Sequence, residues 1–161
     1  MSRHEKALEL LGEFKKTESI LDGIRKFYEE FRSKELPALG QGRISGIVMA
    51  EIFVDYYTCV ETLFFRLSQV FENHLSRDRW HSDLLHKMTL DVESIRPAVI
   101  RDETAVLLDE LMKFRHFKRY YFQFDYDWDR LLYLDKKWND VLRFLGEDFG
   151  RFKDFLTGLS R

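Results

Sequence analysis

The chain has 161 residues and a mass of 19.5 kDa, which suffices for one domain with a substantial hydrophobic core. Its net charge of −2 and pI near 6.2 argue against a protein that coats DNA or an anionic membrane, because such proteins are basic overall. A single cysteine excludes an internal disulfide. The sequence shows no apolar signal core and no apolar run near the roughly 20 residues of a membrane span, so a cytoplasmic protein is predicted.

Apolar side chains recur at three- and four-residue intervals along most of the chain, which is the period of a helix. The first helix is predicted from about His4 to Lys34. The segment from Leu36 to Gly42, which contains Pro37, is predicted to end it. A second long helix is predicted from about Ser45 to Asn73, with Cys59 as a buried structural thiol in its apolar seam.

The second half of the chain also reads as helices and connections. Asp78 is predicted to cap a short helix, and residues 89–101 form a connection. Asp102 is predicted to cap a helix that runs to about Phe122, and Asp127 to cap the last helix. Since no strand-like alternation is long enough for a sheet, we predict an all-α, antiparallel bundle of four long helices plus a short one, in a single domain spanning 1–161.

Basic and aromatic side chains are mixed between Phe114 and Phe122, where a soluble helix would normally separate them. On a helical wheel, the buried stripe of the preceding turns becomes cationic; its members are Leu108, Leu111, Arg115, Lys118, Arg119 and Phe122. A cation on an inward face is costly unless it meets a carboxylate, a partner chain or a phosphate. The sequence leaves two interpretations open: the arginines pair with Glu51, Asp55 or Glu61 inside the bundle, or they form a functional site.

The functional interpretation points to RNA. Arg115 and Arg119, one helical turn apart, can bind a phosphate, and His116 can transfer protons near neutral pH. Neighbouring side chains can contact the backbone or stack on unpaired bases; these are Lys118, Tyr121 and Phe122. This combination suits single-stranded RNA and its cleavage by the neighbouring 2′-hydroxyl without a metal.

Other chemistries find no support in the sequence. It contains no HExxH motif, no Cys/His cluster, no phosphate-binding glycine loop and no nucleophile elbow, so no metal and no cofactor is predicted. The remaining histidines are assigned to surface or packing roles: His4, His74, His81 and His86.

Several short motifs follow one another in a specific order. They are Tyr57-Thr58-Cys59-Val60-Glu61, Trp80-His81 with Leu84-Leu85 and Met88, Arg96-Pro97 with Val99-Ile100, Leu107-Leu108-Asp109-Glu110-Leu111, Phe114-Arg115-His116 with Arg119, and Asp127-Trp128. Their order and spacing resemble the HEPN superfamily, and most closely its HepT-like ribonuclease domains. The resemblance extends from the second predicted helix to the start of the last.

The resemblance implies a helical bundle that forms a homodimer, with the polar motif of each chain facing a cleft at the two-fold interface. It also implies a toxin-type, metal-independent endoribonuclease paired with a nucleotidyltransferase antitoxin, which adds AMP to a tyrosine near the motif. Carried onto this sequence, the catalytic residues are Arg115, His116, Arg119 and Tyr120, and the carboxylates that support them are Asp55 and Glu61. Tyr120 or Tyr121 would accept the AMP, and we assign Tyr121.

The sequence departs from the family's signature, in which an arginine is followed by four to six residues and a histidine, and often by a tyrosine two residues later. Counted from Arg115, the histidine position is occupied by Tyr120 and the tyrosine position by Phe122. The one Arg-x6-His match, Arg79 to His86, is interpreted as chance. Three functions therefore stay open: an endoribonuclease, an inactive module that binds RNA or a nucleotidyltransferase, and a helical interaction domain with structural arginines.

Overall fold

The fold is that of a helical bundle, seen in a computed structural model that describes residues 1–71, 80–121 and 124–161 and every side chain in them except those of Trp80 and Tyr121. The long helices are α1 (Arg3–Glu30), α3 (Arg43–Phe71), α5 (Asp102–Tyr121) and α6 (Trp128–Leu159), and the short helices are α2 (Leu36–Leu39) and α4 (Trp80–Met88). Within the described ranges there is no strand, only an isolated bridge between Val92 and Arg96. The predicted all-α bundle is confirmed.

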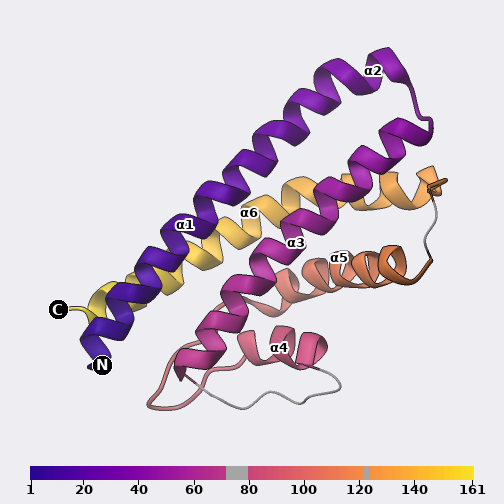
Figure 1. The fold of residues 1–161 in the computed structure, drawn as a ribbon. Coiled ribbons are helices and arrows are strands. Elements are labelled where there is room, and N and C mark those ends of the chain that lie inside the picture. The colour runs from indigo at the N-terminus through magenta and orange to yellow at the C-terminus, as the bar shows by residue number, and fades with distance from the viewer. Residues whose placement is uncertain (72–79, 122–123) are drawn as a thin grey trace.

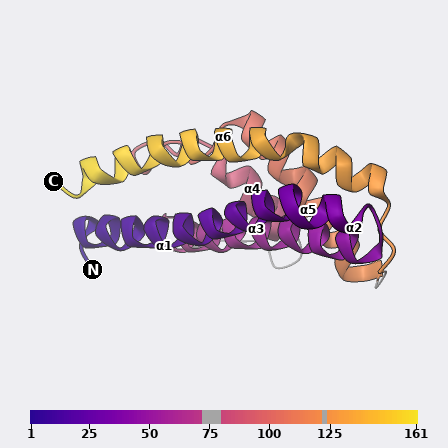
Figure 2. The same cartoon turned by 90° about the horizontal axis from the view of Figure 1, so that it is seen from above.

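Successive long helices run in opposite directions (Figure 1). α3 packs against α1 and α5, and α6 contacts both α1 and α5 from the other side, so the four enclose a common core. Figure 2 shows α6 lying over the layer formed by α1 and α3. α4 packs against α3 and α5, and the two termini lie at the same end of the bundle, away from the C-terminal end of α5 (Figure 1).

The first helical segment ends later than predicted. After α1 the backbone widens into a π-helical turn, Phe31–Glu35, in which the Leu36 amide donates to the Phe31 carbonyl, and α2 then continues to Leu39. Pro37 lies in the first turn of α2, where a missing N–H costs little. The chain turns only at Gly40, whose φ of 76° is readily adopted by glycine. The prediction that Leu36 starts the break is therefore wrong.

The predicted caps have different outcomes. Asp127 caps α6 as expected and accepts from the Asp129 amide at 2.9 Å. Asp102, by contrast, is the first residue of α5, and the carboxylate at that end comes from α6: Asp148, which is fully buried, accepts from the Arg101 amide at 3.1 Å and from the Thr104 hydroxyl at 2.5 Å. Asp78 lies outside the described residues.

Aromatic rings fill the core where the four long helices meet. Trp138 of α6 contacts Tyr28, Phe53 and Tyr56, with ring centroids 4.7, 5.7 and 4.8 Å apart. Burial of rings of this size is the main stabilising contribution in such a bundle. Residues from α1, α3 and α6 are thereby held together, which fixes the position of α3, the helix that carries Glu61.

Candidate functional site

The site centres on a buried carboxylate of α3, that of Glu61. Glu61 is 6% exposed, and its carboxylate faces Arg115 of α5. Arg115 reaches it with both ends of its guanidinium group: Nη1 donates to Oε1 and Nη2 to Oε2, each at 2.9 Å. A bidentate arginine–carboxylate pair is a strong, orientation-specific contact. Of the two interpretations left open by the sequence, pairing inside the bundle is therefore the one that Arg115 adopts.

His81 of α4 completes this cluster. Its Nδ1 lies 2.8 Å from Glu61 Oε2 and 3.2 Å from Arg115 Nη2. Nδ1 cannot donate to the carboxylate and accept from the guanidinium at once. The shorter contact with Glu61 decides the assignment, because an unprotonated Nδ1 would place its lone pair against a carboxylate oxygen. Nδ1 therefore carries a proton that it donates to Glu61.

The remaining neighbours of Arg115 come from α3. Thr58 Oγ1 lies 3.3 Å from Nη1, and the Tyr57 ring lies 4.7 Å from the guanidinium carbon, in position for a cation–π contact. Burial, and secondarily the charge of Glu61, raises the pKa of Tyr57 well above its usual value, so this phenol stays protonated at neutral pH. The Arg115 side chain retains 19% of its exposure and that of His81 36%, so the cluster reaches solvent along one edge.

One turn further along α5, Lys118 pairs with α3. Its Nζ lies 2.5 Å from Oε2 of Glu51. Asp55, one turn along α3 from Glu51, was predicted to support the arginines, and the charged groups that shift its pKa are Glu51 and Lys118. Burial and then the repulsion from Glu51 raise the pKa of Asp55, whereas Lys118 lowers it. Lys118 therefore pairs with Glu51 and also favours the charged form of Asp55.

Arg119, His116 and Tyr120 form a separate, exposed group on α5. The His116 and Tyr120 rings are 4.6 Å apart, and Tyr120 is 61% exposed. Arg119 was predicted to continue the buried stripe, but it lies at the surface: the last buried side chain described in α5 is that of Phe114, which is 1% exposed. The four predicted catalytic residues are therefore divided between the Glu61 cluster and this surface.

Two of the predicted RNA-binding residues, Tyr121 and Phe122, lie at or beyond the end of α5. Phe122 lies outside the described residues, and Tyr121 is the last residue of α5. Lys118 and Arg119 occupy the last turn of α5, where cations interact favourably with the negative end of the helix dipole.

His81 is the site residue that the sequence reasoning missed. It was assigned to a surface or packing role because the histidines show none of the spacings of a metal site. The available signal was Glu61, which follows Val60 in the buried register of its helix and, as a buried carboxylate, requires cationic or hydrogen-bonding partners. That signal calls for a partner, but it does not say which helix supplies it.

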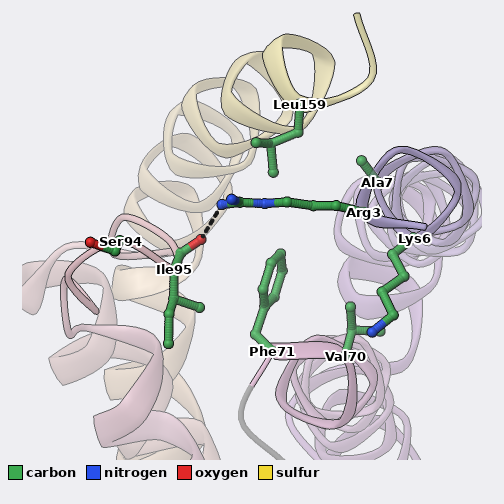
Figure 3. Close-up of a pocket in the computed structure, with 8 residues that line it drawn as sticks. All are labelled: Arg3, Lys6, Ala7, Val70, Phe71, Ser94, Ile95 and Leu159. Carbon is green, nitrogen blue, oxygen red and sulfur yellow. Dashed lines mark hydrogen bonds between the residues drawn. The ribbon is translucent and has the colours of Figure 1, made fainter. Parts of the chain in front are cut away.

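A hollow lies at the end of the bundle where the two termini are (Figure 1). It is a cavity of about 370 Å³ where Arg3 of α1 extends between Phe71 and Leu159 and donates to the Ile95 carbonyl at 3.2 Å (Figure 3). Its described lining contains two cations, Arg3 and Lys6, but neither a carboxylate nor an imidazole. The contact of Arg3 ties the start of α1 to the connection between α4 and α5, so we assign this cavity no chemistry.

Searches for metal sites and membrane spans give no candidates in the described structure. Over residues 1–71, 80–121 and 124–161, no three side chains of His, Cys, Asp or Glu gather closely enough to bind a metal ion. None of the helices in these ranges combines the length and the apolar character required to cross a bilayer.

Comparison with known proteins identifies the family. A family profile described as "HepT-like protein" matches residues 48–156, which is more than half of the chain and runs from α3 through most of α6. The search of curated proteins finds no match, and the search of solved structures finds none either. The match includes all three helices that form the Glu61 cluster, and the chain belongs to the HepT-like family.

Proposed function

We propose that this HepT-like protein is a toxin-type, metal-independent endoribonuclease. The observation that carries the proposal is the group of Arg119, His116 and Tyr120 on the exposed face of α5, within the part of the chain that matches the family. In the proposal Arg119 binds the scissile phosphate, and His116 or Tyr120 takes part in proton transfer. Arg115 reaches the phosphate only through the N–H groups that do not bind Glu61.

The proposed partners follow from the family. RNA would lie across the end of α5, where Lys118, Tyr121 and Phe122 contribute charge and stacking surfaces. A homodimer would place two such surfaces at one cleft, in the cytoplasm. A nucleotidyltransferase-type antitoxin would silence the protein by adding AMP, and Tyr121 is the proposed acceptor.

The ribonuclease proposal is tested with the purified protein and a labelled single-stranded RNA in the presence of EDTA. We expect cleavage that requires a 2′-hydroxyl at the cut and that falls at least tenfold in Arg119→Ala. Arg119 is the better first variant because it is exposed, so its removal should leave the circular dichroism spectrum and melting temperature unchanged. Arg143→Ala, an exposed arginine of α6, is the matched control and should keep full activity. Wild-type cleavage by Arg115→Ala/Arg119→Ala would refute the proposal.

An inactive module that binds RNA or a nucleotidyltransferase is the second candidate. It is favoured by Tyr120 at the position where the family has its histidine, and by the bidentate contact that occupies Arg115. For such a module, fluorescence anisotropy should detect RNA binding while the wild-type protein leaves the RNA intact. Tyr120→His should then create cleavage, and if it leaves the RNA intact, loss of that histidine does not explain the inactivity.

The AMP acceptor is tested by co-expression with a nucleotidyltransferase encoded beside this protein. Intact-mass analysis should show the addition of one AMP group to the wild-type chain and none to Tyr121→Phe. Tyr120→Phe is the matched control, because it removes the adjacent hydroxyl group. AMP on Tyr121→Phe but not on Tyr120→Phe would move the assignment to Tyr120.

A further inference from the structure

The histidine missing from the signature position of α5 has a spatial counterpart on α4. His81 is 34 residues from Arg115 in sequence, yet its Nδ1 is 3.2 Å from the Arg115 guanidinium. Sequence spacing therefore hides an arginine–imidazole pair that the fold assembles. The two side chains also share one carboxylate, since Glu61 Oε2 accepts from Arg115 Nη2 at 2.9 Å and lies 2.8 Å from His81 Nδ1.

The contact with Glu61 indicates which ring nitrogen of the neutral imidazole carries the proton. With Nδ1 protonated and donating to the buried carboxylate, the neutral ring has its lone pair on Nε2. A carboxylate on the far nitrogen orients the ring and stabilises the imidazolium that forms when Nε2 takes a proton. Since 36% of the His81 side chain is exposed, the ring reaches solvent, although the Glu61 carboxylate that orients it is buried.

Two helices of the described structure bring charged side chains to His81. The carboxylate of Glu61 contacts it from α3, and the guanidinium of Arg115 contacts it from α5. An anionic phosphate brought to Arg115 would approach the same edge of the cluster.

We propose that His81 is the general base of this protein, with Glu61 as its positioning residue and Arg115 as the cation beside the reacting phosphate. The proposal rests on the proposed ribonuclease function and replaces His116 and Tyr120 as the proton acceptor. Nε2 of His81 takes the proton of the RNA 2′-hydroxyl, and the 2′-oxygen forms a bond to phosphorus. The bond from phosphorus to the 5′-oxygen breaks, and that oxygen takes a proton from water. The products are a 2′,3′-cyclic phosphate and a 5′-hydroxyl.

The test compares histidine variants of the full-length chain in the RNA cleavage assay. His81→Gln retains an amide that can donate to Glu61 but has no titratable nitrogen, so it should fold normally and lose about 100-fold or more in cleavage rate. His86→Gln removes an exposed histidine of the same helix and should keep wild-type activity. His116→Gln tests the alternative base: a larger loss in this variant than in His81→Gln would assign the proton transfer to His116.

Two further readouts separate catalysis from a structural role. His81→Ala should regain at least tenfold of its activity when imidazole is added, because a free ring can enter the space that the side chain leaves. The acidic limb of the pH–rate profile, present in the wild type, should be lost in His81→Gln and displaced in Glu61→Gln. A melting temperature within a few degrees of the wild type in each variant shows that the fold is intact.

The outcomes distinguish the two levels of the proposal. Cleavage by His81→Gln within about threefold of wild type, together with a loss in His116→Gln, overturns the role of His81 and leaves the ribonuclease function standing. A loss in His81→Ala that imidazole does not rescue, accompanied by a lowered melting temperature, overturns it in favour of a structural role. A wild-type dimer that binds RNA without cleaving it overturns the ribonuclease function and the role of His81 together.

Discussion

Replacement of Arg115 by methionine should destabilise the protein more than any surface change on α5. Methionine retains most of the apolar stem but leaves the Glu61 carboxylate, in a residue that is 6% exposed, without its bidentate partner. Removing one partner of a buried ion pair costs about 3 to 5 kcal/mol. We expect the low end, about 3 kcal/mol, because the Arg115 side chain keeps 19% of its exposure and because His81 still contacts the carboxylate.

This loss is measured by urea denaturation followed by circular dichroism. For a chain of this size, a loss of about 3 kcal/mol corresponds to a fall in melting temperature of about 6 to 12 °C. Arg143→Met is the matched control, because its pair with Asp140 is exposed on both sides; it should cost no more than about 0.5 kcal/mol.

A double variant distinguishes two causes of this loss: the cost of leaving the Glu61 carboxylate buried without a partner, and the loss of the Arg115–Glu61 ion pair itself. In Glu61→Leu/Arg115→Met both charges are gone, and apolar side chains of similar volume often match or exceed the stability of a buried ion pair. We therefore expect the double variant to lie within about 1 kcal/mol of the wild type. A cost below about 1 kcal/mol for Arg115→Met alone would refute the reasoning, since it would mean that Glu61 is adequately solvated without the arginine.

Three further predictions concern stability. Burial raises the pKa of Tyr56 and Tyr57, so the folded state keeps protons that the unfolded chain releases near pH 10. The free energy of unfolding should therefore fall above about pH 10, by up to about 1.4 kcal/mol per pH unit for each tyrosine, as measured by urea titrations from pH 8 to 11. Asp148→Ala should cost about 3 kcal/mol, against almost nothing for the exposed Asp140→Ala, because Asp148 is fully buried and accepts from Arg101, Thr104 and Arg151. Gly146→Ala/Gly150→Ala should raise the stability by about 1 to 2 kcal/mol, because both positions are inside α6 and an added Cβ meets no atom within 4 Å; no increase in the urea midpoint would contradict this.

Helical periodicity was sufficient to predict the bundle and most helix positions. It failed at the end of α1, because a proline followed by glycines normally marks a break, whereas the π turn at Phe31–Glu35 starts a new helical turn in which Pro37 is tolerated. It also placed Arg119 on the buried stripe of α5. A helical wheel assumes that one face stays buried along the whole helix, and it does not show where the neighbouring helices stop covering that face.

The candidate site was only partly accessible from sequence. Arg115 and Glu61 could each be identified as a charge in a buried register, and their pairing was one of the alternatives. His81 could not be added to them, because its position depends on how α4 packs across α3 and α5. The capping of α5 by Asp148 was missed for the same reason, since the carboxylate comes from a helix 47 residues away in sequence from Arg101.

The position of both termini at one end of the bundle has a practical consequence for studying this protein. The basic and aromatic surface of α5 lies toward the other end (Figure 1). An affinity tag, a fluorophore or a surface anchor attached at either terminus therefore leaves that surface accessible. An RNA, a second copy of the chain or a nucleotidyltransferase can be presented to the immobilised protein without obstruction by the attachment.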